Sequence, residues 1–149
     1  ELGNISERRL YQLISGQRGL PPFLTQNAGL SSGMMIVQYT AASLVNKNKQ
    51  LCAPVCVDSI VSCNGQEDHV SMGANAGVKW LQVVKNTEIL LAMEFMAAAQ
   101  ALSLRAAESF PIANKIMQAY RQVVPMLEED RVLSTDIQAT VNFLKHLHF

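Results

Sequence analysis

The sequence contains few charged residues and no excess of either sign. Charged side chains make up 16% of the 149 residues and the formal net charge is zero, whereas about a quarter of a typical soluble chain is charged. Proteins that bind nucleic acid normally carry a basic patch, so the balanced charge argues against such a partner. The scarcity of charge also predicts that another subunit, or a further part of the same protein, covers much of the surface.

Cysteine is scarce as well, and its spacing does not match a known metal module. Cys52, Cys56 and Cys63 are an odd number in a sequence without a signal peptide, which favours a reduced, cytoplasmic setting. Together with His69 they give the spacing C-x3-C-x6-C-x5-H, which lacks the paired C-x2-C knuckles of zinc modules. We therefore expect unligated thiols and no metal site.

Several other patterns are missing. No segment alternates convincingly with the period of two that a half-buried strand needs, and neither a Ser-His-Asp arrangement nor a Gly-rich phosphate loop stands out. The longest apolar run, residues 89–104, contains Glu94 and Gln100 and is shorter than the roughly 20 residues of a membrane span. We expect a buried helix there and no membrane partner, with Glu94 paired or hydrogen-bonded because a buried carboxylate needs a partner.

The apolar residues, 49% of the chain, recur mostly with helical spacing and predict an all-α protein with one domain over residues 1–149. We predict helices over residues 4–15, 31–51 and 66–103, a fourth helix opened by Ser109-Phe110-Pro111 and a last one opened by a capping box at Thr135 and Gln138. In the fourth helix, the residues expected to face inward are Ile112, Ile116, Met117, Tyr120, Val123 and Val124.

The third predicted helix is the longest and the most apolar. It would measure on the order of 55 Å at 1.5 Å per residue. Its later part is apolar nearly all round, and such a helix must be buried on all sides. This predicts a long-helix bundle made of several helices or several subunits. The sequence has no initiator Met and opens directly into helix-compatible residues, as a fragment of a longer protein would.

The polar stretch from Val57 to Gly73 is the most informative part of the chain. Asn64-Gly65 tolerates positive φ and predicts a turn, and Gln66, Glu67 and Asp68 follow it directly. Carboxylates are favoured in the first turn of a helix, so ordinary capping of the third helix is one interpretation. The other is that Glu67, at the mouth of a long rigid helix, meets a cationic substrate.

The segment Gln66 to Gly73 resembles the Gln-Glu-Asp-His motif of the histidine ammonia-lyase family, within the aromatic amino acid lyases. Other family motifs are matched in the same order over nearly the whole chain, most strongly over residues 4–105. They are Ser6-Glu7-Arg8-Arg9, Leu20-Pro21-Pro22-Phe23-Leu24, Ser32-Gly33-Met34-Met35-Ile36, Thr40-Ala41-Ala42, Asn48-Lys49, Val57-Asp58-Ser59-Ile60 and Glu94.

The resemblance implies a subunit of the aromatic amino acid lyase fold, packed through long central helices into a homotetramer whose active sites draw on several subunits. It also implies elimination of ammonia from L-histidine to give urocanate, with a methylidene-imidazolone electrophile formed from an internal Ala-Ser-Gly. That tripeptide is absent from the sequence, as are the family's substrate-binding tyrosine and arginine. The chain therefore resembles the C-terminal part of the lyase, and we expect it to be inactive alone.

Glu67 is the one site residue that the resemblance transfers to this chain, as a catalytic and substrate-binding glutamate. Its neighbours Gln66 and His69 are weaker candidates for substrate contact. The sequence departs from the family near this position: Ser31, Val61, Cys63 and Asn64-Gly65 stand where the family usually has Asn, Pro, Ser and Ala-Asn. These changes bear on loop geometry and substrate preference.

Two alternatives remain open. One is a phenylalanine or tyrosine ammonia-lyase or aminomutase on the same scaffold; those relatives usually carry an amide where Glu67 stands, which favours histidine. The other is a helical assembly protein without catalysis, which an upstream Ala-Ser-Gly in the same reading frame would exclude.

Overall fold

The computed structural model describes residues 1–57, 59–105 and 110–147, and these residues form five α-helices and no β-strand. The all-α prediction is therefore confirmed. The helices are α1 (Leu2–Ile14), α2 (Met35–Leu51), α3 (Gly73–Arg105), α4 (Pro111–Val123) and α5 (Leu133–Lys145), and a short 3-10 helix, η1 (Cys63–Gly65), lies between α2 and α3.

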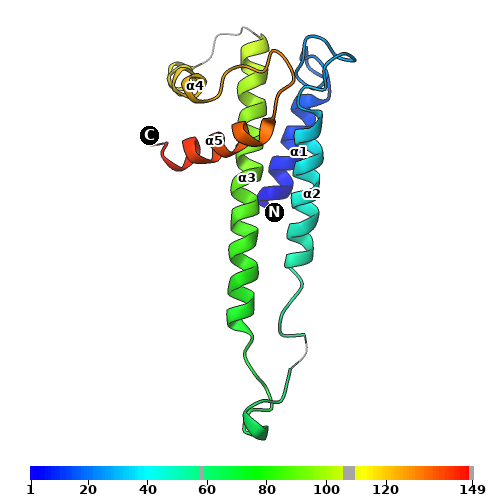
Figure 1. The fold of residues 1–149 in the computed structure, drawn as a ribbon, viewed down its shortest axis with the longest axis vertical. Helices are drawn as coiled ribbons and strands as arrows, with labels where there is room; N and C mark the ends of the chain where they lie inside the picture. The colour runs from blue at the N-terminus through cyan, green and yellow to red at the C-terminus, as the bar shows by residue number, and fades with distance from the viewer. Residues whose placement is uncertain (58, 106–109, 148–149) are drawn as a thin grey trace.

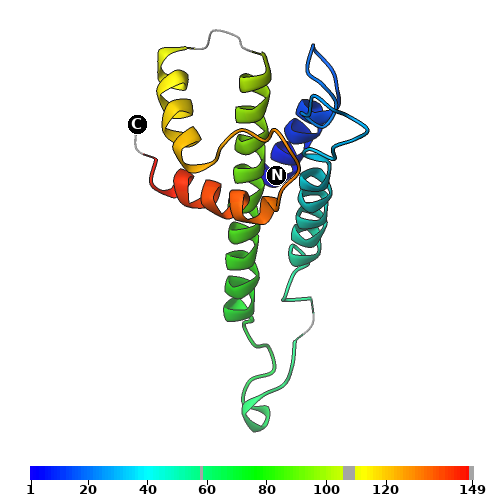
Figure 2. The same ribbon diagram turned by 45° about the horizontal axis from the view of Figure 1, so that its top comes forward.

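Helix α3 is the axis of the molecule. α1 and α2 lie side by side along one flank of it, whereas α4 and α5 gather around its C-terminal half on the other flank (Figures 1 and 2). α3 contacts α1, α2 and α5, and α4 packs on α5. The chain between α2 and α3 runs past the free ends of both helices and returns, so it projects from the bundle (Figure 1).

The main core fills the space between α1, α2 and the second half of α3. Its fully buried side chains include Leu10, Met34, Val37, Leu90 and Met93. Each buried side chain of this size contributes about 1.5–3 kcal/mol relative to its exposed state. Apolar residues at helical spacing therefore account for the bundle.

A second, aromatic cluster joins α3 to the C-terminal helices. The Phe95 and Tyr120 rings meet edge to face with centroids 4.9 Å apart, and Tyr120 also meets Phe143 at 5.2 Å. Pairs of this geometry add about 0.5–1.5 kcal/mol beyond area burial. The cluster fixes α4 and α5 against the end of α3.

The start of α2 differs from the predicted one. α2 begins at Met35 rather than at Ser31 or Ser32. The Ser32 and Gly33 amides donate instead to the Asp130 carboxylate, at 2.8 and 2.9 Å. The predicted Ser caps are therefore wrong: a carboxylate from the α4–α5 connection binds these amides.

The predicted capping box of the last helix is also wrong. α5 begins at Leu133 with Val132 at the cap position, and Thr135 already lies in the first turn, where its hydroxyl donates to the Val132 carbonyl at 2.8 Å. α4 begins at Pro111, as predicted. Ser109, the expected opening residue of α4, lies outside the described residues, as does Asp58.

Burial along α3 and α4 agrees with the predictions only in part. Between Ile89 and Leu104 most α3 side chains are buried or half-buried, but Leu91 and Leu102 are 41% and 38% exposed. In α4, Tyr120 is buried, whereas Ile112 and Val123 are 60% and 48% exposed. The prediction that the last two face inward is wrong: among the described residues α4 packs on α5 and, through Tyr120, on Phe95 of α3, and these contacts leave Ile112 and Val123 exposed.

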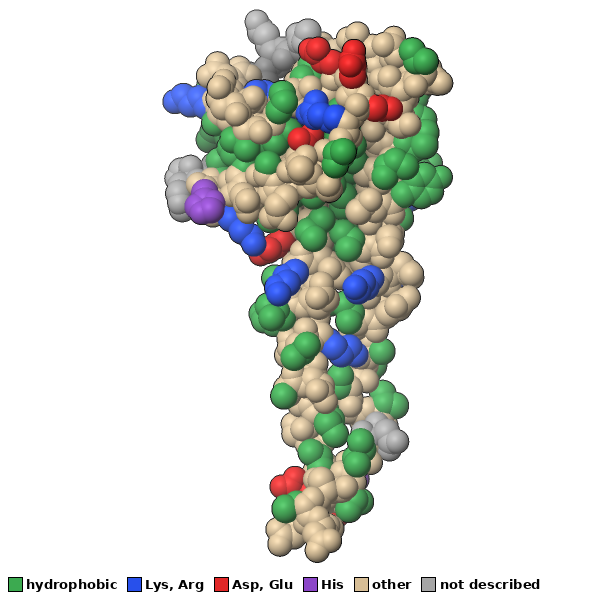
Figure 3. Space-filling model, viewed as in Figure 1, with side chains coloured by type: hydrophobic (Ala, Val, Ile, Leu, Met, Phe, Trp, Pro, Cys, Tyr) green, Lys and Arg blue, Asp and Glu red, His purple; other side chains and the backbone are tan. Residues whose placement is uncertain are grey.

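Apolar side chains also lie exposed on the N-terminal half of α3. Val78 and Trp80 are 71% and 68% exposed, and green surface follows this narrow part of the molecule (Figure 3). Of the helices in the described ranges, only α3 is long and apolar enough to cross a membrane. Its buried Asn86 and Gln100, however, hydrogen-bond to α2 and to the connection between α4 and α5, as in a core helix of a bundle.

Glu94 behaves as predicted. Its side chain is 19% exposed, and its carboxylate forms an ion pair with the guanidinium of Arg9 in α1, with 3.4 Å between nitrogen and oxygen. The ion pair thereby joins α3 to α1 and gives the partly buried carboxylate the partner that it needs.

Candidate functional site

The projecting chain between α2 and α3 carries all of the predicted site residues. We call residues 59–70 the tip loop. Its two sides are joined by a short antiparallel pairing: the Ser62 amide donates to the Glu67 carbonyl at 2.9 Å, and the Glu67 amide donates to the Ser62 carbonyl at 3.3 Å. The polypeptide therefore reverses direction between these two residues.

The reversal is possible because three consecutive residues adopt positive φ. Cys63, Asn64 and Gly65 have φ of 53°, 57° and 84°, and the Gly65 amide closes the turn onto the Ser62 carbonyl at 3.2 Å. Glycine adopts this region freely and asparagine tolerates it better than most residues. The turn predicted at Asn64-Gly65 is thus confirmed.

Glu67 stands on this turn and not in a helix. α3 begins only at Gly73, so the predicted helix start at Gln66 is wrong. The pairing of Ser62 with Glu67 holds the backbone in a bridge at the point where helical bonds were expected. Capping of α3 by Glu67, and stabilisation of its charge by that helix terminus, are both excluded by this geometry.

The Glu67 side chain is exposed, and within the described ranges its carboxylate has no hydrogen-bond or ion-pair partner. Acidic surface is visible at this end of the molecule (Figure 3). A carboxylate in this state can accept a hydrogen bond from an imidazole N–H or take up a proton.

The other two candidates share the tip loop. Gln66 and His69 are exposed, and the Cys63 thiol lies 3.8 Å from the Gln66 amide oxygen. The structure therefore brings Gln66, Glu67 and His69 onto one short loop. They do not line the groove of about 780 Å³ between α1, α2 and α3, which is lined by other residues, among them Leu2, Asn48 and Thr87.

Two side chains make polar contacts in the chain between α2 and α3 that the sequence patterns did not predict: Ser59, which belongs to one of the matched family motifs, and Lys79 of α3. The Ser59 hydroxyl accepts from the Val70 amide at 3.0 Å and donates to the Asp68 carbonyl at 3.3 Å. The Lys79 ammonium of α3 donates to the carbonyl of Ala53, just after the end of α2. A serine in a polar loop and a lysine on a helix carry no spacing signal, so only the fold reveals these contacts.

The cysteines offer no alternative site. Cys52, Cys56 and Cys63 are exposed free thiols. Among the described residues, no group of three or more His, Cys, Asp or Glu side chains could hold a metal ion.

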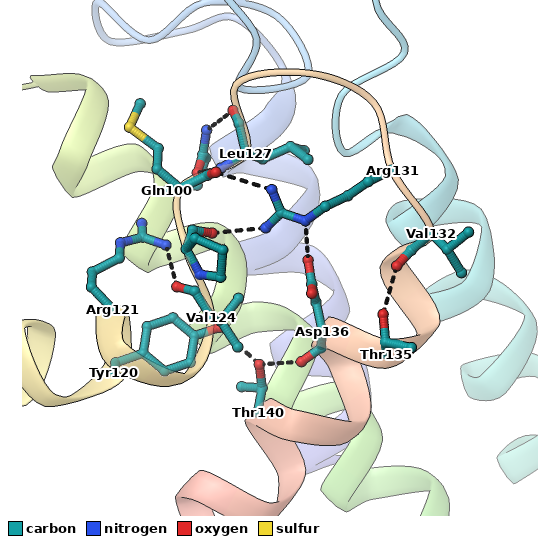
Figure 4. Close-up of polar contacts among 12 residues, drawn as sticks. Gln100, Tyr120, Arg121, Val124, Leu127, Arg131, Val132, Thr135, Asp136 and Thr140 are labelled. Atoms are coloured by element: carbon teal, nitrogen blue, oxygen red, sulfur yellow. Dashed lines mark hydrogen bonds and ion pairs between the residues drawn. The ribbon is translucent and has the colours of Figure 1, made fainter.

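The densest polar cluster lies at the opposite end of α3 and joins α3, α4 and α5 (Figure 4). Burial raises the pKa of the Tyr120 hydroxyl, which is 2.7 Å from the Thr140 hydroxyl. Burial lowers the pKa of Arg121, whose guanidinium donates to the Val124 carbonyl and the Ser103 hydroxyl.

The rest of this cluster also bonds to the protein itself. Arg131 donates to the Asp136 carboxylate and to the Met126 and Pro125 carbonyls. Because these donors are used to hold the backbone between α4 and α5, we interpret the cluster as structural.

Comparison with known proteins places the chain among lyases and aminomutases. The model of the aromatic amino acid lyase family matches residues 1–124. The chain is 48% identical over 147 residues to a histidine ammonia-lyase of Geobacillus sp. (strain WCH70) and 47% identical over 147 residues to that of Bacillus subtilis (strain 168). Each match covers 97% of this chain and 29% of the relative.

Solved structures give the same grouping. The chain superposes on a histidine ammonia-lyase from Trypanosoma cruzi with a TM-score of 0.89 and 43% identity, covering 96% of this chain and 28% of that one. It superposes on a tyrosine aminomutase from Streptomyces globisporus with a TM-score of 0.87 and 32% identity, covering 96% and 29%. The chain thus spans less than a third of the length of the relatives it matches.

Proposed function

The chain belongs to the aromatic amino acid lyase family, and on this premise we propose that it is part of a histidine ammonia-lyase, which eliminates ammonia from L-histidine to give urocanate. The observation that carries the proposal is a carboxylate at position 67, exposed on the tip loop. A carboxylate suits an imidazole, whereas relatives that act on phenylalanine or tyrosine usually have an amide here. The higher identity to histidine ammonia-lyases than to the tyrosine aminomutase supports the same choice.

The role that we assign to Glu67 is to bind the imidazole of the substrate or to move a proton during elimination. Its carboxylate accepts a hydrogen bond from the ring N–H, with Gln66 and His69 alongside on the same loop. A hydrogen bond to a charged group contributes about 1.5–3 kcal/mol. That is worth roughly one to two decades in rate if the bond strengthens in the transition state.

The family uses a methylidene-imidazolone-type electrophile, which withdraws electrons from the substrate and so assists loss of the amino group. The sequence has no Ala-Ser-Gly from which to form it, so the residues present cannot supply this group. In our proposal another part of the enzyme provides it. This chain contributes the Glu67 loop and the helical bundle that carries it.

We also propose that the functional enzyme is an oligomer, a homotetramer by resemblance, with this chain as one helical segment of a larger subunit. The exposed position of Glu67 outside the bundle supports this, because a substrate bound there needs walls from elsewhere. The exposed apolar side chains of Val78 and Trp80 on the N-terminal half of α3 support it as well. The unpaired thiols fit a cytoplasmic setting.

The test is turnover by the full-length protein that contains this chain. We expect urocanate to form from L-histidine, followed by its ultraviolet absorbance, and little reaction with L-phenylalanine or L-tyrosine. The isolated 149-residue chain serves as a background control, because it cannot form the electrophile. Conversion of tyrosine or phenylalanine without urocanate formation would refute the proposal in favour of a relative with different substrate preference.

A further inference from the structure

Ser59 occupies a special place in the tip loop. Its half-buried hydroxyl spans the two sides of the loop, since it accepts from the Val70 amide at 3.0 Å and donates to the Asp68 carbonyl at 3.3 Å. Among the described residues, the backbone pairing of Ser62 with Glu67 and the contacts between Cys63 and Gln66 at the turn also link the two sides. One hydroxyl therefore supplies two of the hydrogen bonds that hold the loop closed.

Packing does little to hold this loop. Ile60 and Val61 are 64% and 65% exposed, and residues 63–69 are exposed throughout. Among the described residues, no buried side chain lies in the segment 63–69, so within this chain the position of Glu67 depends on hydrogen bonds. The Ser59 bonds act on the Asp68 carbonyl and the Val70 amide, one and two peptide groups beyond the one that follows Glu67. They therefore restrain the backbone on the C-terminal side of Glu67.

We propose that Ser59 is a positioning residue for Glu67: its hydroxyl fixes the backbone that follows Glu67 and so aims the carboxylate at the substrate. This inference rests on the proposed function. Without the hydroxyl, the Val70 amide and the Asp68 carbonyl hydrogen-bond to water instead. The Glu67 carboxylate then samples several directions. Since the Glu67 interaction matters most in the transition state, misalignment lowers kcat more than it raises KM.

A double-mutant cycle in the full-length enzyme tests whether Ser59 acts through Glu67. We expect Ser59→Ala to lower kcat by about 10-fold or more, with KM within about threefold of wild type. In a Glu67→Gln background the same change should lower kcat by less than about twofold, because coupled residues are not additive. Equal losses in both backgrounds would overturn the inference, because Ser59 would then act independently of Glu67.

Two further variants separate positioning from general damage. Ser59→Thr keeps the hydroxyl and should retain kcat within about threefold of wild type. Ser71→Ala makes the same truncation at an exposed serine whose hydroxyl has no partner among the described residues, and it should leave kcat unchanged. If Ser71→Ala matches Ser59→Ala, or if Ser59→Thr is as impaired as Ser59→Ala, the inference fails.

Hydrogen exchange gives a readout that does not depend on histidine turnover. In Ser59→Ala the Val70 amide should exchange at least about tenfold faster than in wild type, while amides of α1 keep their rates. Unchanged exchange at Val70 would overturn the positioning role even if kcat had fallen. Absence of urocanate from the wild-type enzyme would instead refute the proposed function, and the Val70 rates would still show whether Ser59 holds the loop.

Discussion

The carboxylate of Glu67 is carried by a loop and caps no helix, which determines what its loss should do. Glu67→Gln in the full-length protein should lower histidine turnover by roughly one to two decades, because a charge-assisted hydrogen bond is lost. The melting temperature should stay within about 1 °C of wild type, since surface changes away from caps and cores are nearly neutral.

Glu128→Gln, at an exposed glutamate between α4 and α5, is the matched control and should change neither quantity. Normal turnover by Glu67→Gln would remove this residue from the site. If Glu67→Gln lowered the melting temperature but left turnover normal, Glu67 would have a structural role, although its side chain makes no hydrogen bond or ion pair among the described residues.

Gln100 is a buried polar residue whose hydrogen bonds join α3 to the connection between α4 and α5. It is 1% exposed, and its amide donates to the Leu127 carbonyl at 2.8 Å and accepts from the Leu127 amide at 3.0 Å (Figure 4). Gln100→Met keeps the size of the side chain but leaves two buried backbone groups unpaired. We expect it to lower the free energy of unfolding by about 2–4 kcal/mol.

A thermal or urea melt of the full-length protein checks this value, with Gln118→Met at an exposed position of α4 as the control. Equal stability of the two variants would contradict the assigned role of Gln100.

At the scale of elements, the start of α2 depends on the chain beyond α4. The Asp130 carboxylate accepts from the Ser32 and Gly33 amides, and these bonds, that from Ser32 first, hold the pKa of Asp130 below its ordinary value of 3.8. A carboxyl whose pKa is lower in the folded state stabilises the fold above its unfolded pKa. The stabilisation is lost as the pH falls through the lowered folded value.

The pH dependence of melting tests this contact. Between about pH 6 and 8, the melting temperature of Asp130→Asn should lie below that of wild type by a constant difference. This difference should shrink below about pH 4. Glu129→Gln, at the exposed neighbouring carboxylate, should show no such difference. A difference in melting temperature between wild type and Asp130→Asn that is independent of pH down to about pH 2 would contradict an ionic contact.

The helices could be predicted from the sequence because each carries its own apolar stripe. The starts of α2, α3 and α5 could not. Just before α2 the amides of Ser32 and Gly33 bind Asp130, which lies 98 residues from Ser32 in the sequence. The start of α3 was missed because a bridge between Ser62 and Glu67 competes with helix formation, and local acidic residues do not reveal such a bridge.

For the site, the sequence placed Gln66, Glu67 and His69 together because they are neighbours in the chain. The contacts of Ser59 across the tip loop depend on how the loop folds back. A list of residue types and spacings does not contain that information.

On the scale of the whole molecule, many large apolar side chains are exposed. Exposed large side chains lie on the first half of α3 and on α4, among them Trp80, Val78, Phe110 and Ile112. Surfaces of this kind mark contacts with other chains or further parts of a protein. We expect the isolated 149-residue chain to be helical and to self-associate.

Circular dichroism and light scattering check both parts of this expectation. The spectrum should have the minima of an α-helical protein, and the scattering mass should exceed that of a 16.4 kDa monomer. A well-behaved monomer at that mass would contradict the role assigned to the apolar surface, and a β-rich spectrum would contradict the fold.

The separation of the tip loop from the hydrophobic core has a consequence for how such a protein can change. Folding of the bundle depends on side chains such as Leu10, Met93 and Tyr120, none of which contacts the described part of the loop through the core clusters. Selection on the chemistry of the loop and selection on stability therefore act on different residues. For protein engineering, the stretch between Leu51 and Gly73 is a cassette: exchanging it between relatives replaces the group offered to the substrate while the scaffold that presents it remains unaltered.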